Sequence, residues 1–331
     1  MTTVVAGSGN RLRYRFGSVR LDTDVPLSGF EHCRAPTTAV DEDEDEDEDP
    51  FNFTLRRTGS PPAGGRLALR GRGRRLLEVW RRPDGGYVVC ASGAAACTLE
   101  PDGRTLTWHL GPGQPGPDDA DFIVATVLPR ALTRQHAHVL HAATVLGPGG
   151  ALLLCGPSGI GKSTIATALH RATGWPLLGD DAAVLGLAGG QAMVRSCTQD
   201  IRLWDDARDW LALPPGARLA RHGTKARHPL PGHGLRSAPV ATVVRLVAAG
   251  ELAVEEPGPS RRLVDLRDHL MRLDRSDPAC FAQEFSFLVA WMRSVRVLRL
   301  HQPRQHVFLP RTVEHLARIA TEVTTCAHAT T

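Results

Sequence analysis

The first third of the chain carries short runs in which hydrophobic and polar residues alternate, a pattern typical of half-buried β-strands. Turn signals such as Pro83-Asp84-Gly85-Gly86 separate these runs. The predicted strands are Arg11–Val19, Arg66–Arg70, Leu76–Trp80, Tyr87–Cys90, Cys97–Leu99 and Thr105–Leu110. We therefore expect a β-rich N-terminal domain over residues 1–135, in which nothing has catalytic spacing.

The rest of the chain alternates apolar strand-like runs with segments of helical period, which predicts an α/β domain over residues 136–331. A helix over Asp119–Gln135, kinked or divided at Pro129, leads into it after a Pro/Gly linker at Gly111–Asp118. The predicted strands are Val139–Leu146, Ala151–Cys155, Trp175–Gly179, a hairpin of Ala182–Leu187 with Gln191–Cys197, Val240–Ala248, Glu251–Val254 and Val295–Leu300. The predicted helices are Lys162–Arg171, Asp205–Leu213, Leu263–Leu273, Pro278–Met292 and Thr312–Thr324, and residues 214–238 are expected to form a mobile loop.

Composition narrows the class of protein only slightly. A chain of 331 residues allows one large or two medium domains, and no apolar stretch reaches the length of a membrane span. The N-terminus has no signal-peptide pattern, and the seven cysteines are scattered without a C-x-x-C pair. We therefore expect reduced thiols, a cytoplasmic location, and neither a membrane nor a nucleic-acid partner; a homo-oligomer stays open.

An unbroken Asp/Glu run, Asp41–Asp49, interrupts the β-rich region. Nine adjacent like charges cannot pack, so a solvated, disordered loop is the simplest interpretation. A docking arm for a basic partner and a competitor for the chain's own phosphate site are the alternatives.

The most specific motif follows the buried strand Ala151–Cys155, where the chain reads G-x-x-x-x-G-K-S, the phosphate-binding loop. Its glycines let successive N–H groups face one point, and the following helix adds the positive end of its dipole. Lys162 would reach the β- and γ-phosphates, and Ser163 would ligate Mg²⁺. The predicted nucleotide-binding residues are Gly156, Pro157, Ser158, Gly159, Ile160, Gly161, Lys162, Ser163 and Thr164.

Two carboxylates, Asp180 and Asp181, close the apolar run Trp175–Gly179 shortly after this loop. The spacing leaves room for one helix and a return strand, so we expect the two strand ends to be neighbours at one sheet edge. One carboxylate can hold Mg²⁺ through Ser163 and water, and the other can accept the proton of an attacking hydroxyl. A GTPase or an ABC-type ATPase is disfavoured, because the guanine motif N-K-x-D and the stretch L-S-G-G-Q are both missing.

Three segments together resemble the C-terminal domain of HPr kinase/phosphorylase: Leu140–Val145, Gly156–Thr164 and Leu177–Leu185. The β-rich N-terminal part looks like HPr-kinase-related proteins found beside peptide-modifying genes, which include lasso-peptide precursor kinases. The resemblance implies a P-loop kinase fold and roles for particular residues. Asp180 matches the general base of the family, Asp181 its metal ligand, and His141 its active-site histidine.

The chain also departs from that family at two places. Thr164 stands where HPr kinases carry glutamate, and their later glycine-rich signature has no counterpart. These departures remove the support for HPr itself as substrate and for the reverse phosphorylase reaction.

The lysine content singles out one further residue. Of 39 Lys and Arg residues, only Lys162 and Lys225 are lysine. Arginine is a broad planar fork and lysine a compact point charge, so lysine should persist where a phosphate cradle is crowded. We predict that Lys225 is catalytic, brought to the transferring phosphoryl group by its loop; a chance lysine in a linker is the alternative.

The sequence as a whole predicts a phosphotransferase, an HPr-kinase-like serine kinase that uses ATP and Mg²⁺. Its acceptor is expected to be a serine of a peptide or small protein, for which a ribosomally made precursor peptide is one candidate. A small-molecule hydroxyl kinase and a nucleotide-dependent switch without enzymatic activity are the alternatives.

Overall fold

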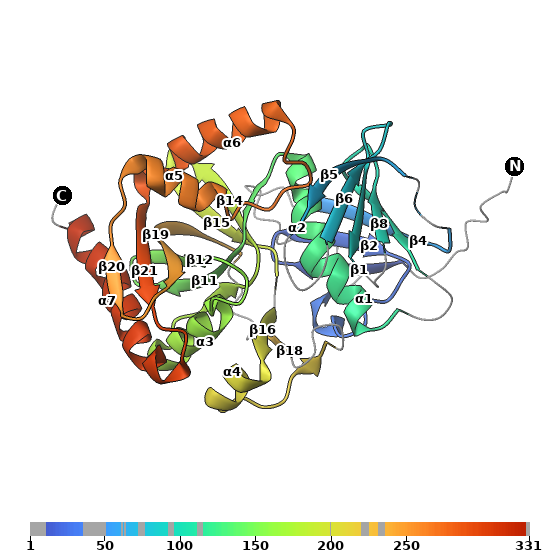
Figure 1. Cartoon of the computed structure of the whole chain (residues 1–331). Coiled ribbons are helices and arrows are strands. Elements are labelled where there is room, and N and C mark those ends of the chain that lie inside the picture. The colour runs from blue at the N-terminus through green and yellow to red at the C-terminus, as the bar shows by residue number, and fades with distance from the viewer. Residues whose placement is uncertain are drawn as a thin grey trace, which may run out of the picture.

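The computed structural model describes residues 11–35, 51–60, 62, 64–71, 77–91, 96–110, 115–198, 200–219, 225–230 and 236–328. The acidic run Asp41–Asp49 and residues 111–114 of the predicted linker lie outside these ranges. The fold is of the mixed α/β class, with a β-rich N-terminal region beside a second large sheet that carries the phosphate loop (Figure 1).

The N-terminal region forms a nine-stranded sheet with the order β3-β1-β2-β4-β9-β8-β7-β6-β5. Its strands are β1 (Leu12–Phe16), β2 (Val19–Thr23), β3 (Arg34–Ala35), β4 (Phe51–Thr58), β5 (Arg66–Arg70), β6 (Leu77–Arg81), β7 (Tyr87–Ala91), β8 (Ala96–Leu99) and β9 (Thr105–His109), and a short 3₁₀ turn, η1 (Glu31–Cys33), precedes β3. The β-rich prediction is confirmed. The first predicted strand, Arg11–Val19, covers β1 and the turn at Gly17 and ends at the first residue of β2, with which β1 forms a hairpin. The alternation pattern did not predict β4.

The helix expected before the second sheet is present, but it changes its winding. It runs through α1 (Pro117–Phe122), the π-helical turn η2 (Ile123–Val127), α2 (Leu128–Ala131) and the 3₁₀ turn η3 (Leu132–Gln135). Pro129 has no N–H to donate and its ring disfavours a straight helix, so the irregular turn beside it is the expected response. The helix begins at Pro117, inside the predicted linker, because proline suits a first helical position.

The second sheet also has nine strands, in the order β10-β14-β15-β19-β12-β11-β13, with β21 paired to β19 and β20 paired to β21. Its strands are β10 (His138–Leu140), β11 (Ala142–Gly147), β12 (Gly150–Cys155), β13 (Leu177–Gly179), β14 (Ala183–Ala188), β15 (Gln191–Ser196), β19 (Ser237–Ala248), β20 (Ala253–Glu255) and β21 (Arg296–Gln302). A three-stranded sheet of β16 (Asp200–Trp204), β17 (Ala217–Arg218) and β18 (Lys225–Pro229) lies beside it. The predicted hairpin across residues 188–190 is confirmed as β14 and β15.

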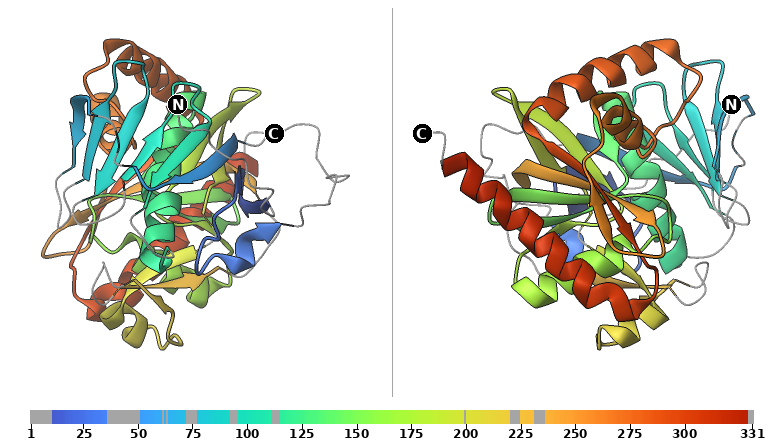
Figure 2. Two further views of the ribbon diagram at one scale, coloured as in Figure 1. Left: turned by 90° about the vertical axis from the view of Figure 1, so that its right-hand side faces the viewer. Right: turned by 60° about the vertical axis from the view of Figure 1, so that its left-hand side comes forward.

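Helices cover both faces of the second sheet (Figures 1 and 2). They are α3 (Lys162–Thr173), α5 (Pro259–Arg267), α6 (Pro278–Trp291) and α7 (Leu309–His328), with short 3₁₀ turns η5 (Met292–Ser294) and η6 (His306–Phe308). A further short helix, α4 (Asp205–Trp210), lies beside β16 of the small sheet. Along β12, Leu152 and Leu154 pack with α3 and α7, whereas Leu153 and Cys155 pack toward α5 and α6. A strand that is buried on both faces has a continuous run of apolar residues in its sequence. This explains the uninterrupted apolar run Ala151–Cys155 before the phosphate loop.

Three expected elements differ in the structure. The predicted strand Val139–Leu146 is divided at His141, because β10 pairs with β14 whereas β11 pairs with β12 and β13. The predicted mobile loop 214–238 is wrong for its described part, which contains β17, β18 and the start of β19. Helix α5 starts at Pro259 and ends at Arg267, before the expected end at residue 273. The hydrophobic pattern missed β18 because its buried side chains are Ala226 and Arg227, the latter a charged residue.

The two large parts of the chain share one hydrophobic core. Its members from beyond residue 135 include Val139, Val184 and Leu273, which pack with the N-terminal sheet and with α1 and α2. The β1–β2 turn also docks on β15, since Ser18 donates both its N–H and its Oγ–H to the Ser196 carbonyl, each at 2.9 Å. Gly17 fits there because a Cβ would meet that carbonyl. The division at residues 135/136 stays a prediction.

Removal of the N-terminal region should therefore expose an apolar face. We expect a chain of residues 136–331 to lose cooperative thermal unfolding, because burial of a large apolar side chain contributes about 1.5–3 kcal/mol and several would be exposed together. Circular dichroism and calorimetry on the truncated and full chains measure this. A truncated chain that unfolds cooperatively near the full chain's midpoint would show an independent domain.

Candidate active site

Three segments predicted to carry chemistry end at the same edge of the second sheet. The end of β12 at Cys155 leads into the phosphate loop, and the end of β13 at Gly179 leads into Asp180. Strand β11 lies between them, antiparallel to both, so it starts at this edge directly after His141. Strands β12 and β13 are therefore separated by β11, whereas the sequence predicted that their ends would be neighbours. Their carboxyl ends still reach one edge of the sheet, where ligands of open α/β sheets bind.

The phosphate loop has the backbone that a phosphate cradle requires. Gly156, Gly159 and Gly161 have φ of 147°, 78° and 105°, a backbone conformation that would be strained for a residue with a side chain. A Cβ at Gly156 would lie 3.0 Å from the Leu246 carbonyl oxygen, so only glycine fits. The loop ends at the N-terminus of α3, whose backbone N–H groups and dipole favour an anion.

Lys162 lies inside this cradle. Its side chain is buried, and its Nζ donates to the carbonyl oxygens of Gly156 at 3.0 Å and Pro157 at 3.3 Å. Burial lowers the pKa of Lys162, while Asp181 and Asp180 act in the opposite direction. The ammonium group is thus held at the loop mouth, where the exposed Pro157, Ser158 and Gly159 leave the backbone open to a ligand.

Two side chains that the sequence did not predict as site residues donate hydrogen bonds to backbone carbonyls of the phosphate loop. Gln302, at the end of β21, donates from Nε2 to the Ile160 carbonyl at 3.1 Å. Arg304 donates from Nη2 to the Gly159 carbonyl at 3.0 Å. Gln302 and Arg304 lie at and just after the end of β21, which reaches the same sheet edge as the phosphate loop. That position could have indicated a role at the site, but only once the strand order is known.

Asp180 is the carboxylate nearest the phosphate loop. Ser163 Oγ donates to its Oδ1 at 3.0 Å, and the backbone N–H of Arg202 donates to its Oδ2 at 3.1 Å. The Thr198 hydroxyl holds the backbone of Asp180 at both its N–H and its carbonyl. Thr198 Oγ1 accepts from the Asp180 N–H at 3.1 Å and donates to the Asp180 carbonyl at 2.7 Å. Burial, followed by the neighbouring Asp181, raises the pKa of Asp180 to about 6.

Asp181 occupies an unusual backbone conformation beside it. Its φ is 63°, and the Ala182 N–H donates to the Asp180 carbonyl at 2.8 Å, which closes a tight three-residue turn. Its Oδ2 accepts from Arg202 Nη1 at 2.8 Å. Burial alone would raise the pKa of Asp181, but Arg202 and the other cations nearby lower it below its usual range. Asp181 is therefore held anionic.

His141 completes the group at the start of β11. Its Nδ1 lies 2.8 Å from the Asp181 carbonyl oxygen and 4.0 Å from Asp181 Oδ1. A carbonyl only accepts, so Nδ1 carries the hydrogen and Nε2 is the acceptor nitrogen. Burial, with Lys162 adding repulsion, lowers the pKa of His141 to about 4. His141 is therefore neutral at physiological pH.

Lys225 lies near the two carboxylates, although it sits on a strand. It pairs with Trp204 at the start of β18, with its Nζ 5.8 Å from the Trp204 ring centroid. Its charge lowers the pKa of both Asp180 and Asp181, which places the ammonium group within electrostatic range of the site. The structure thus gives Lys225 a fixed position rather than a mobile loop; its catalytic role stays a prediction.

The described residues contain no group of three or more His, Cys, Asp and Glu side chains arranged as a metal site. Magnesium, however, is usually held by one or two carboxylates together with substrate phosphates and water. Ser163 and the two adjacent carboxylates supply hard oxygen ligands of that kind, beside a loop shaped for phosphate. The residues present therefore fit a Mg²⁺–nucleotide complex.

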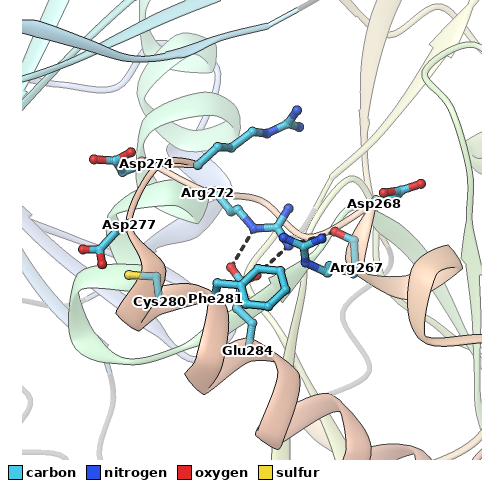
Figure 3. Close-up of a pocket in the computed structure, with 9 residues that line it drawn as sticks. Arg267, Asp268, Arg272, Asp274, Asp277, Cys280, Phe281 and Glu284 are labelled. Carbon is cyan, nitrogen blue, oxygen red and sulfur yellow. Dashed lines mark hydrogen bonds and ion pairs between the residues drawn. The ribbon is translucent and has the colours of Figure 1, made fainter. Parts of the chain in front are cut away.

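A separate cavity of about 350 Å³ lies between the α5–α6 connection and α6 (Figure 3). Its wall includes the ion pair of Arg272 with Glu284, both of whose donor–acceptor distances are 2.6 Å. No residue predicted from the sequence as a site residue lines it. The cavity therefore belongs to no part of the phosphate-loop site.

The segment that carries the phosphate loop matches one family of known proteins. The "AAA domain" family model matches residues 152–224, which include the phosphate loop, α3 and both carboxylates. No curated protein matches the chain. Among solved structures, the Hpr(Ser) kinase/phosphatase from Coxiella burnetii aligns over 56% of this chain and 98% of its own, with 14% identity and a TM-score of 0.29. A similarity of that size carries no conclusion. The loop geometry and the family-model match together define a P-loop nucleotide-binding domain.

No helix among the described residues is both long and apolar enough to cross a membrane.

Proposed function

We propose that this protein is an ATP- and Mg²⁺-dependent phosphotransferase that moves the γ-phosphoryl group to a hydroxyl, with serine in a peptide or small protein as acceptor. The observation that carries the proposal is the contact between Ser163 Oγ and Asp180 Oδ1 at 3.0 Å, directly beside the buried Lys162. A phosphate cradle joined to a second carboxylate, Asp181, provides both a metal anchor and a proton acceptor, the two parts that phosphoryl transfer needs.

The proposed reaction forms a bond between the acceptor oxygen and the γ-phosphorus and breaks the bond to the β–γ bridging oxygen, so that ADP leaves. Asp180 accepts the hydroxyl proton, because its raised pKa of about 6 is close to the working pH. Lys162 and the N-terminus of α3 hold the phosphate charge. Ser163 and Asp181 would hold Mg²⁺, which would supply positive charge to neutralise the phosphates.

His141 has a positioning role in this proposal. Its Nδ1–H donates to the Asp181 carbonyl, within the tight turn that presents both carboxylates. Because its pKa of about 4 keeps it neutral, it adds no competing positive charge beside the metal ligand.

The peptide or small-protein acceptor, including a ribosomally made precursor peptide, rests on the sequence resemblance of three segments that include Gly156–Thr164 and Leu177–Leu185. The cytoplasmic location, which rests on the scattered cysteines and the absent signal-peptide pattern, remains a prediction, and so does a homo-oligomer.

The acceptor can be sought directly by incubating the full-length protein with γ-labelled ATP, Mg²⁺, and the peptides and metabolites made by neighbouring genes. We expect label on a serine hydroxyl of a peptide. Label on a metabolite would instead identify a small-molecule kinase. Tight nucleotide binding without label on any acceptor would favour a nucleotide-dependent switch.

Replacement of Lys225 tests its predicted catalytic role. Lys225→Ala should lower the transfer rate by ~10²-fold, because a fixed cation near the transferring phosphate is lost. Lys225→Arg should recover only part of the rate, since a planar fork does not replace a compact ammonium group. Single-turnover transfer and nucleotide affinity are measured for both variants. If Lys225→Ala transfers phosphate like the wild type, Lys225 is only a strand residue.

A further inference from the structure

A buried arginine, Arg202 on β16, joins the two carboxylates of the site to the N-terminal region. Its backbone N–H donates to Asp180 Oδ2 and its Nη1 to Asp181 Oδ2. On its other side, Arg202 Nε lies 3.2 Å from Oδ1 of Asp121. The Arg202 side chain is only 9% exposed and that of Asp121 only 5%. One guanidinium therefore bridges two acidic side chains that are 60 positions apart in the chain.

Asp121 comes from outside the α/β part of the molecule. It belongs to α1, the helix that follows the N-terminal sheet, and it precedes the π-helical turn η2. Figure 1 shows α1 beside β16 and β18, on the side of the second sheet that faces the N-terminal region. We propose that Asp121 is a positioning residue of the phosphoryl-transfer site, which acts through Arg202 to hold the Asp181 carboxylate in the orientation that binds metal.

The backbone conformation of Asp181 requires contacts that hold it in place, and the Arg202 bridge supplies one of them. With φ of 63°, Asp181 is in a region that non-glycine residues rarely adopt and that persists only where surrounding contacts fix it. Its Oδ2 contact with Arg202 and its carbonyl contact with His141 are such contacts. A buried guanidinium is held in place by charged groups on both of its sides, and Asp121 provides the second of these as an ion pair at 3.2 Å.

The charges around Arg202 support the same conclusion. Burial lowers the pKa of Arg202, whereas Asp121, Asp181, Asp180 and Asp200 raise it. Asp121 therefore favours the charged guanidinium from outside the site, together with the two site carboxylates. Partners that orient a metal-binding carboxylate typically change metal affinity or activity by ~10- to 100-fold when they are removed.

This inference rests on the proposed function, because it takes Asp181 as the metal ligand. The test measures binding and not transfer. Mn²⁺ is titrated into the full-length protein saturated with ADP, and bound metal is followed by electron paramagnetic resonance; ADP affinity is measured separately in EDTA. Asp121→Asn should weaken Mn²⁺ binding about tenfold while ADP affinity in EDTA stays within about twofold of the wild type.

Two further variants separate positioning from general stability. Glu284→Gln is the matched control, since it breaks a similarly buried carboxylate–arginine pair at the separate cavity (Figure 3). Both variants should unfold at a lower temperature, but Glu284→Gln should bind Mn²⁺ like the wild type. Asp121→Glu retains the charge and should recover part of the metal affinity.

A double variant tests whether Asp121 acts through Arg202. Arg202→Gln should weaken Mn²⁺ binding at least as much as Asp121→Asn, and adding Asp121→Asn to Arg202→Gln should cause no further loss. Normal Mn²⁺ binding by Asp121→Asn, or losses that add in the double variant, would overturn the proposal. If Asp121→Asn does not fold, Arg202→Gln is measured in its place, and Mn²⁺ binding equal to that of Glu284→Gln would overturn the proposal.

The outcomes also distinguish this inference from the proposed function. A wild-type protein that binds Mn²⁺ and ADP but transfers phosphate to no acceptor would contradict the kinase proposal and leave the role of Asp121 intact. A wild-type protein that transfers phosphate while Asp121→Asn binds metal normally would do the reverse.

Discussion

Lys162→Ala should abolish phosphoryl transfer, with a fall in rate of ~10³-fold or more, or about 4 kcal/mol of barrier. The Lys162 ammonium group is buried at the mouth of the loop, where Gly156 and Pro157 carbonyls hold it. No other lysine or arginine donates to those two carbonyls among the described contacts. The transferring phosphate would therefore lose its nearest fixed cation. Single-turnover transfer from labelled ATP measures the loss.

Arg171→Ala provides a matched control for this prediction. Arg171 is an exposed cation in the last turn of the same helix, α3, so its removal changes the net charge equally but leaves the loop intact. We expect wild-type transfer from Arg171→Ala and an unchanged unfolding midpoint. Wild-type turnover in Lys162→Ala would contradict the assignment of the loop as a phosphate site.

Asp180→Asn should lower transfer by ~10²-fold or more and leave nucleotide affinity near normal, because the amide cannot accept the hydroxyl proton. The substitution keeps the shape of the side chain and an oxygen that can accept from Ser163, so the loop should remain in place. Rapid-quench kinetics at saturating ATP, with nucleotide affinity measured by calorimetry, separate the chemical step from binding.

Asp181→Asn should behave differently from Asp180→Asn. Loss of its charge should raise the Mg²⁺ concentration needed for half-maximal rate, because a neutral amide is a weaker ligand for a hard cation. The same substitution also leaves Arg202 with one carboxylate partner fewer, so thermal unfolding must be measured alongside. If the two variants show the same rate and the same Mg²⁺ dependence, the proposed division between proton acceptor and metal ligand is wrong.

Several local elements of this protein were readable from the sequence because their signals are local. The phosphate loop combines a buried strand, glycines and Lys162 in one uninterrupted stretch, and the structure gives those glycines the positive φ values that the motif requires. The strand β5 and helix α6 were predicted within one residue of their bounds, since each has turn or capping residues at its ends. The two carboxylates were found for the same reason, directly after an apolar strand.

The order of the strands could not be read in this way. β11 lies between β12 and β13, and it is this arrangement that brings His141 to the same edge as Asp180. Strand β18 escaped prediction because Arg227 is buried by tertiary contacts: its guanidinium lies 3.7 Å from the Phe30 ring centroid and donates to the Gly29 carbonyl at 2.7 Å. A hydrophobic pattern does not record a charge that another part of the chain compensates.

The sequence by itself determined that this chain carries a phosphate loop followed by two carboxylates, because backbone geometry and strand burial depend on neighbouring residues. The tertiary structure alone decided which distant groups surround them. Arg202 lies 21 positions from Asp181, whereas Asp121 lies 81 positions from Arg202, and nothing in their local sequence marks either residue. Buried ion pairs are stable only when charge, distance and desolvation are matched, and that match exists only once the whole chain is folded.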